Sequence, residues 1–170
     1  LPLSAATRGM CGDNIAWLLR DGVLTISGDG DMYDYKENSP APYSSNKDNI
    51  KKVVFSGGVK KIGAFAFYKF ESLEEIEFNE GLESIRRAAF SGCSSIKELS
   101  FPSSMEMVTS YSYDESQNSS TGAFSHCTSL HTVTLNENLT KLGCASFFGC
   151  TSLKTINWNS IYCAITNGYY

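Results

Sequence analysis

A segment of 23 residues recurs along this chain and limits its fold more than any other feature. Residues 73–95, LEEIEFNEGLESIRRAAFSGCSS, share their apolar spacing with the segments before and after them. A fixed period of 20–29 residues with L-x-x-L-x-L spacing is typical of a solenoid, in which each repeat packs on its neighbours. The third copy is longer and contains an 11-residue insertion. The copies are residues 50–72, 73–95, 96–129 and 130–152, followed by a partial copy at 153–170.

Each copy places its apolar residues at the same positions. Apolar residues at positions 1, 4 and 6 put the last two on one face of a short strand. The residue before the next apolar pair is glycine, serine or asparagine in every copy. We expect the chain to turn there, because Gly and Asn tolerate positive φ. These residues are Gly58, Gly81, Ser104 and Asn138.

A small residue followed by phenylalanine ends each unit, and we interpret this pair as a short helical turn whose ring fills the interior. Stacked coils would then align the rings in one continuous column: Phe67, Phe90, Phe124 and Phe147. Their strands would pair in parallel at about 4.8 Å per coil. The prediction is an α/β repeat fold: a solenoid with a parallel concave sheet and short helical turns on the other side.

Residues 11–35 predict a β-hairpin that caps the N-terminal end of the stack. Alternating apolar residues flank Asp21-Gly22, which is a good hairpin turn. Without a cap, the open end would expose the apolar interior and a strand edge. Trp17 is assigned to this cap, with a surface ligand anchor as the alternative. Residues 28–49 read as a loop, so residues 1–49 are assigned to the cap and connecting loop and 50–170 to the repeats.

The repeat pattern I-x-x-G-V-x-x-I-G-x-x-A-F-x-x-C-x-S-L stands here as GGVKKIGAFAFYKFESL, GLESIRRAAFSGCSSI and NLTKLGCASFFGCTSL. This pattern resembles the BspA-like leucine-rich repeat family of surface and secreted proteins in bacteria and some parasitic protozoa. CGDNIAWLLRDGVLTISGDGDMYDY is similar to the segment that often precedes such repeats. The chain departs from the pattern at Phe70, where the family has Cys, at Arg86, where it has Gly, and in the long third copy.

Composition excludes several classes of function. A net charge of −4 and a pI near 5.2 argue against nucleic-acid binding, because phosphate contacts need a basic surface. No apolar run approaches the roughly 18 residues of a membrane helix, so direct membrane insertion is not expected. The first residues, LPLSAATRG, lack the features of a secretion signal, so any signal lies outside this sequence.

No motif indicates catalysis. The GDGD segment at 28–31 lacks the 12-position ligand pattern of a calcium loop and reads as a turn. No phosphate loop, paired-carboxylate site or metal motif occurs. We therefore expect neither an enzyme nor a cofactor.

The six cysteines fall into two sets. Cys93, Cys127 and Cys150 share one repeat position, which predicts a column of buried free thiols on adjacent coils. A metal site or disulfide is the alternative, since His126 and His131 lie near Cys127, but no C-x-x-C pair has zinc spacing. A Cys127–His nucleophile would lack an orienting third group. The sequence does not determine the pairing of the remaining cysteines, which are Cys11, Cys144 and Cys163.

Candidate binding residues lie between the apolar positions of the strands, where side chains point away from the interior. The middle coils contribute acidic residues and the later coils hydroxyl groups: Glu75, Glu77, Glu98, Ser100, Thr132 and Thr134. This surface suits a partner with a basic patch, or a glycan or peptide held by hydrogen bonds. The alternative is a solvated sheet face with a Lys52–Glu75 cross-strand pair.

The insertion at residues 109–121, TSYSYDESQNSST, is the most individual feature. Insertions in solenoids form loops on one face, often the binding face, and its Tyr111 and Tyr113 are candidate contact anchors. The alternative is a disordered, tolerated loop. Asn118 and Asn138 lie in glycosylation acceptor triplets, which matter only if a eukaryote secretes the chain.

The resemblance implies a secreted or cell-surface recognition or adhesion module. Its partner would be a protein or glycoprotein of a host or neighbouring cell, or of the matrix. The alternative is a structural spacer or self-assembly segment of a longer repeat protein, because the partial fifth copy has no obvious polar cap.

Overall fold

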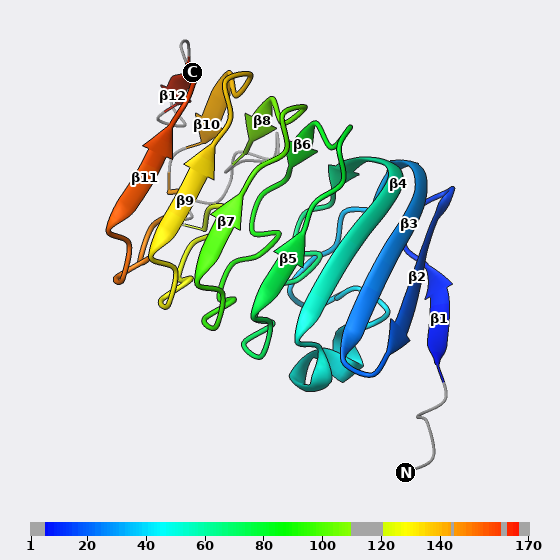
Figure 1. The fold of residues 1–170 in the computed structure, drawn as a ribbon. Coiled ribbons are helices and arrows are strands. Elements are labelled where there is room, and N and C mark those ends of the chain that lie inside the picture. The colour runs from blue at the N-terminus through cyan, green and yellow to red at the C-terminus, as the bar shows by residue number, and fades with distance from the viewer. Residues whose placement is uncertain (1–5, 110–120, 144, 161–162, 167–170) are drawn as a thin grey trace.

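The computed structural model describes residues 6–109, 121–143, 145–160 and 163–166. Figure 1 shows successive coils side by side, with the N-terminal strands at one end of the stack and the last coil at the other. The chain begins with β1 (Thr7–Met10), β2 (Ile15–Arg20) and β3 (Val23–Asp31), which pair antiparallel in that order. A short 3-10 helix, η1 (Ser44–Asn49), then leads into β4 (Lys52–Ile62), which pairs in parallel with β3.

The predicted hairpin is confirmed by the pairing of β2 with β3. Asp21 and Gly22 have φ values of 50° and 78°. Positive φ at both central residues gives the turn the twist of the flanking strands. Trp17 is buried, and its ring lies 5.8 Å from that of Tyr43, so it packs in the interior and not as a surface anchor.

The segment at 28–31 belongs to strand β3 and is not the predicted turn. Gly28 and Gly30 have φ values of 135° and 105°, and the register with β4 shifts between Gly30 and Asp31. Such a shift is a bulge, which glycine accommodates at little cost. Pairing with β4 therefore extends the strand into a segment whose composition suggested a loop.

Each later coil contributes two short strands. The first strands are β5 (Glu75–Glu77), β7 (Glu98–Ser100), β9 (Thr132–Leu135) and β11 (Thr155–Trp158). The second strands are β6 (Ser84–Ile85), β8 (Met107–Val108), β10 (Lys141–Gly143) and β12 (Ala164–Thr166).

Parallel pairing joins equivalent strands of neighbouring coils. The start of β4 pairs with β5 and its end with β6, after which β6, β8, β10 and β12 continue one sheet. The strands β7, β9 and β11 form a second parallel sheet. Residues at equivalent repeat positions are partners, as Leu99 is of Val133. The predicted parallel register is therefore confirmed.

The predicted turn position is wrong for the first copy. Gly58 lies inside β4, which pairs with β3 along its length and so remains extended. The chain does turn beside Gly81, Ser104 and Asn138. Among these four residues only Gly81 has a positive φ, of 96°.

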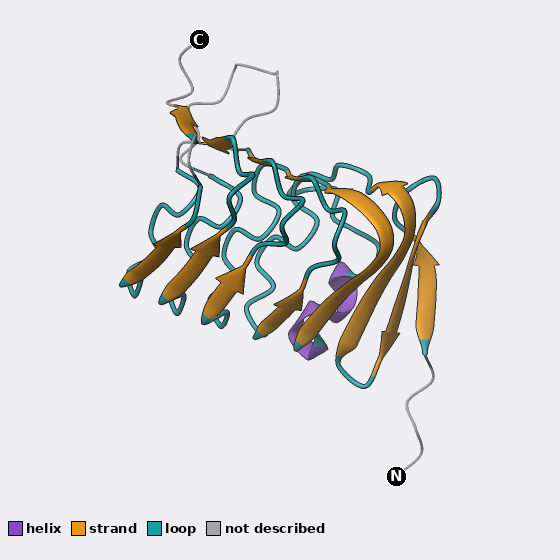
Figure 2. Cartoon of the chain, turned by 45° about the horizontal axis from the view of Figure 1, so that its top comes forward, coloured by secondary structure: helices purple, strands orange, loops and turns teal. Residues whose placement is uncertain are grey.

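The predicted helical turns on the other side of the coils are also wrong. Within the described ranges, helix is confined to η1 (Figure 2). The turn residues Phe65 and Lys69 have φ values of 55° and 56°, and equivalent left-handed residues recur in the later coils. Left-handed residues interrupt an α-helix. The fold is therefore mostly β-sheet and turn.

The turns are stabilised by hydrogen bonds between coils. The N–H groups of Phe65, Phe67 and Lys69 donate to carbonyls one coil further on, at 3.1, 2.7 and 2.8 Å. An α-helix would instead direct each N–H to a carbonyl four residues earlier in the same segment. The turn side of each coil is therefore joined to the next coil by backbone hydrogen bonds, as the two strand sides are.

The phenylalanine column is confirmed. Ring centroids are 4.9 Å apart between Phe67 and Phe90, 5.2 Å between Phe90 and Phe124, and 5.7 Å between Phe124 and Phe147. The planes of each pair lie within 13° of parallel. Tyr43 extends the column by stacking on Phe67 at 5.4 Å. One aromatic stack therefore runs from the segment before the repeats to the fourth coil.

Asn79 is a buried polar residue that the sequence analysis did not single out. Its Nδ2 atom donates to the carbonyls of Gly57, Val59 and Glu80 at 3.2, 3.0 and 3.0 Å. Asn136 occupies the same repeat position and donates to the carbonyls of Pro102 and Met105. These amides satisfy carbonyls where the chain leaves the first strand of a coil.

Replacing Asn79 with alanine should lower the free energy of unfolding by about 1–3 kcal/mol, because the buried carbonyl of Val59 loses this donor. Chemical denaturation would measure the change. Asn157→Ala is the control, since this exposed amide donates only to Thr134 Oγ1 at 3.2 Å and its loss should cost less than about 0.5 kcal/mol. Equal effects of the two substitutions would contradict the role of Asn79.

Candidate binding face

The first strands of the coils expose one continuous set of side chains, which we call the strand face. Burial alternates along β7 and β9: in β7, Glu98 and Ser100 are exposed on either side of the buried Leu99. This alternation follows from the two-residue period of a strand. The strand face consists of Lys52, Val54, Glu75, Glu77, Glu98, Ser100, Thr132, Thr134, Thr155 and Asn157.

Strand register aligns these residues in two columns. Lys52 is the partner of Glu75, and Val54 is the partner of Glu77. In the second sheet Glu98 aligns with Thr132 and Thr155, while Ser100 aligns with Thr134 and Asn157. The structure thus brings together six of the predicted binding residues: Glu75, Glu77, Glu98, Ser100, Thr132 and Thr134.

A bridging lysine determines the electrostatics of the acidic half. Lys52 Nζ lies 2.9 Å from Glu75 Oε1 and 2.5 Å from Glu77 Oε1. Hydrogen bonds to Glu77 and then Glu75 raise the pKa of Lys52. The sequence analysis predicted the contact between Lys52 and Glu75, which are direct strand partners. It did not predict the contact with Glu77, because Glu77 lies two residues further along β5 than the partner of Lys52.

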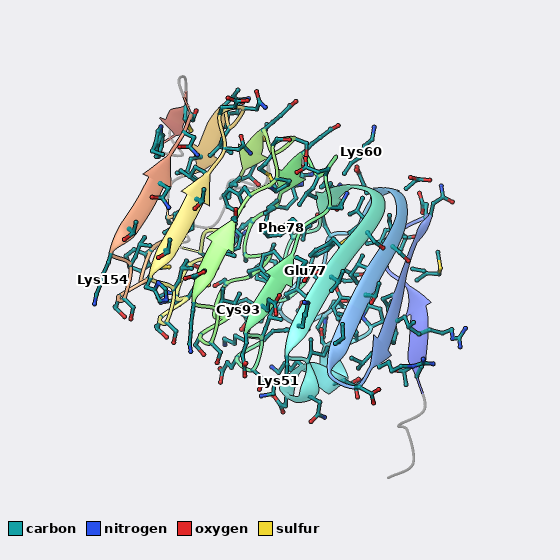
Figure 3. The ribbon with its side chains drawn as sticks, in the orientation of Figure 1. Lys51, Lys60, Glu77, Phe78, Cys93 and Lys154 are labelled. Carbon is teal, nitrogen blue, oxygen red and sulfur yellow. The ribbon has the colours of Figure 1, made fainter. Side chains whose placement is uncertain are left out.

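The face keeps a net negative charge, because Lys52 offsets only one of the two glutamates it contacts and Glu98 adds a further charge. Glu98 is exposed and forms no ion pair with the residues that the structure describes. Figure 3 shows Glu77 on β5 in the middle of the strand face, between β4 and β7. A ligand would therefore find an acidic centre in which only part of the charge is neutralised by Lys52.

The later coils offer neutral hydrogen-bonding groups. His131 Nδ1 lies 2.9 Å from Thr132 Oγ1, and Asn157 Nδ2 donates to Thr134 Oγ1 at 3.2 Å. Hydroxyls both donate and accept, so each retains capacity for a further partner. This half of the face can hold polar groups of a peptide or a glycan but offers no counter-charge.

Several predicted residues lie outside the described ranges: Tyr111, Tyr113 and Asn118, together with Cys144. The structure describes only the two ends of the insertion, Thr109 and Thr121. Asn138 is described and exposed, and its Nδ2 atom donates to the carbonyl of Ser103 at 2.8 Å. The amide that a glycan would modify is thus engaged with the preceding coil.

The column of free thiols is confirmed, but only Cys93 and Cys127 are buried as predicted, since Cys150 is partly exposed. The Sγ atoms of Cys93, Cys127 and Cys150 donate to the carbonyls of Phe67, Phe90 and Phe124 at 3.2–3.3 Å, and all three thiols are free. Burial raises the pKa of the Cys93 thiol. Phe70 takes the cysteine position of the first copy, where it is buried with its ring 5.5 Å from that of Phe67.

The two histidines near Cys127 serve other contacts. The His126 ring packs edge-on against Phe148 at 5.4 Å, and His131 contacts Thr132. Among the described residues, no three His, Cys, Asp or Glu side chains gather as metal ligands would. The same residues include no helix with the length and apolar character needed to cross a membrane.

A model of the BspA type leucine rich repeat region (6 copies) matches residues 42–121 and 118–170, which is more than half of the chain. Comparison with curated protein sequences finds no match.

Solved structures of leucine-rich repeat proteins are similar. One from Eubacterium ventriosum has a TM-score of 0.57 and 20% identity, covering 90% of this chain and 40% of its own. The T. pallidum leucine rich repeat protein has a TM-score of 0.47 and 22% identity, and the match covers 94% of this chain and 82% of that protein. A leucine rich cell surface protein from Faecalibacterium prausnitzii has a TM-score of 0.46 and 18% identity, and the match covers 92% of this chain and 55% of that protein. The chain thus spans less than half of the E. ventriosum protein, and that likeness supports the fold alone.

Proposed function

The chain belongs to the BspA type leucine-rich repeat family, and we propose that it is a protein-recognition module of a secreted or cell-surface protein. Its fold is a leucine-rich repeat, and proteins with such repeats typically act as protein-interaction modules. We take the coils to form a solenoid whose strand face is the concave, ligand-binding side. The resemblance to a family of surface and secreted proteins supports the proposed location outside the cell.

The strand face is the observation that supports this proposal. Its residues are fixed at strand spacing by two parallel sheets, so a partner meets a preorganised surface and little ordering entropy is lost on binding. The acidic centre with Glu98 favours a basic patch, and the threonines beside it favour hydrogen bonds. We propose a protein or glycoprotein of a host or neighbouring cell, or of the matrix, as the partner, with the insertion loop at 109–121 adding contacts.

Binding to a panel of cell-surface and matrix proteins would test the proposal. Changing Glu75, Glu77 and Glu98 to alanine should weaken binding roughly tenfold, since about 1.4 kcal/mol of lost interaction corresponds to that factor. Deleting residues 109–121 should weaken binding as well. Surface plasmon resonance at low and high salt would measure both effects, and the loss caused by the alanine variant should shrink at high salt.

The matched control changes three other exposed glutamates, Glu83, Glu106 and Glu137, to alanine. It removes the same charge from outside the strand face, so its binding should equal that of the wild type. If wild type binds no member of the panel, or if both triple variants lose binding equally, the strand face is not the contact surface.

Self-association is a second candidate, favoured by exposed apolar side chains on β11. Ile156 and Trp158 are 48% and 42% exposed, although their strand partners Val133 and Leu135 are buried. Such residues on an edge strand can pair with another chain. Sedimentation velocity would show concentration-dependent association that Ile156→Ser abolishes, and a strict monomer at all concentrations would exclude self-assembly.

A further inference from the structure

Cys127 and Cys150 occupy equivalent positions on the third and fourth coils, where the two backbones are closely joined. The N–H of His126 donates to the carbonyl of Phe148 at 2.6 Å. A Cβ on Gly149 would lie 2.5 Å from His126 Nδ1, so glycine leaves room for the His126 ring. Each cysteine thus follows a residue that lies against the other coil.

The two thiols lie close enough to shift each other's pKa. Each donates its one proton to a phenylalanine carbonyl, Cys127 to Phe90 and Cys150 to Phe124. Neighbouring parallel strands lie about 4.8 Å apart, and disulfides join Cα atoms about 4.4–6.8 Å apart. The coil spacing therefore matches the span of a disulfide without unfolding either coil.

Solvent reaches one thiol of this pair. Cys150 is partly exposed, whereas Cys93 and Cys127 are fully buried. The neighbouring Cys127 side chain lowers the pKa of Cys150, against the opposing effect of burial. The Cys150 side chain and burial raise the pKa of Cys127. Cys150 thus combines access with thiolate character, which are the two requirements of a reactive cysteine.

We propose that Cys127 and Cys150 form a reversible dithiol–disulfide pair that reacts with small-molecule disulfides. The Cys150 thiolate attacks one sulfur of the small disulfide, forming a mixed disulfide and releasing one thiolate. The Cys127 thiol loses its proton to the released thiolate, and its sulfur attacks Cys150 Sγ and expels the second thiolate. Two protein thiols are oxidised by two electrons, and one small disulfide is reduced to two thiols.

The result would be a covalent link between the third and fourth coils. The third coil contains the insertion, so the link would tie the coil that bears it to the next one. This inference stands on the thiol geometry and does not depend on the identity of a binding partner. An oxidising extracellular environment would favour the linked state.

The experiment treats the reduced, folded full chain with oxidised glutathione and maps its peptides by mass spectrometry. We expect a peptide pair linked through Cys127 and Cys150 in the wild type. Cys127→Ser should lose the link and retain glutathione on Cys150, because no resolving thiol remains. Cys150→Ser should leave Cys127 without glutathione. Dithiothreitol should release the link in the wild type.

Cys93→Ser is the matched control, since Cys93 belongs to the same column and donates to the Phe67 carbonyl but is fully buried. This variant should form the Cys127–Cys150 link to the same extent as the wild type. With iodoacetamide, the folded wild type should be alkylated at Cys150 at least about tenfold faster than at Cys93. Thermal melts would establish that each variant is folded.

Three results would overturn the proposal. The first is a link that forms only in urea, which would show that the folded coils hold the thiols too far apart. The second is a link between Cys93 and Cys127 in place of the expected one. The third is equal alkylation rates at Cys93 and Cys150 in the folded chain, which would remove the distinction between exposed and buried thiols.

Discussion

Replacing Phe90 with alanine is expected to lower the free energy of unfolding by about 3–5 kcal/mol. The Phe90 side chain is fully buried and lies in the middle of the aromatic column. Its ring stacks on Phe67 at 4.9 Å and on Phe124 at 5.2 Å, and it meets Phe78 edge-on at 6.2 Å. Truncation removes contacts on both sides and leaves a cavity that the coils cannot close, because their backbones are hydrogen-bonded to each other.

Chemical denaturation would measure this loss, and the melting temperature should fall by roughly 10 °C for a domain of this size. Phe148→Ala is the matched control, because that ring is 53% exposed and lies outside the column. Its effect should remain below about 1 kcal/mol. If the two substitutions destabilise the chain equally, the aromatic column does not stabilise the interior as described.

Replacing Gly63 with alanine should also destabilise the chain strongly, by about 3 kcal/mol or more. A Cβ at this buried position would lie 1.8 Å from the carbonyl oxygen of Tyr33. The neighbouring backbones are joined there, since the Tyr35 N–H donates to Ala64 O and the Ala64 N–H to Asp34 Oδ1, both at 2.8 Å. The added methyl group would push the segment after β3 away from the first coil.

Gly30→Ala separates this clash from the general cost of losing glycine. No atom lies within 4 Å of a Cβ at Gly30, but its φ of 105° strains an alanine by roughly 1–2 kcal/mol. Denaturant titration of both variants should place Gly63→Ala below Gly30→Ala in stability. The reverse order would mean that the segment after β3 can move away from the first coil without cost.

Much of the fold could be predicted because the repeat converts sequence spacing into spatial register. Residues at the same repeat position became partners on neighbouring strands, as Leu99 did with Val133 across the longer third copy. The same rule aligned Phe90 with its stacking neighbours and Cys127 with Cys150. When similar coils stack, residues at the same repeat position must lie next to each other, so the spacing alone predicts which residues are in contact.

The candidate site was predictable in position but not in its interactions. Register placed Glu75, Glu98 and Thr132 on one face. The ion pairs of Lys52 with both Glu75 and Glu77 depend on the conformation of one long, flexible side chain, which the repeat spacing does not predict. The exposure of Cys150 next to a buried Cys127 likewise depends on how the last coils pack.

The sequence by itself determined the period, the parallel register and the columns of aromatic and thiol side chains, because apolar residues at fixed spacing can be buried only by stacking coils. The tertiary structure decided the backbone between those positions. The turn at Phe67 is not a helix because its N–H donates to Ala89 of the next coil. The strand β4 continues through Gly58 because β3 pairs with it. In both cases the partner is distant in sequence, so local propensity could not predict the outcome.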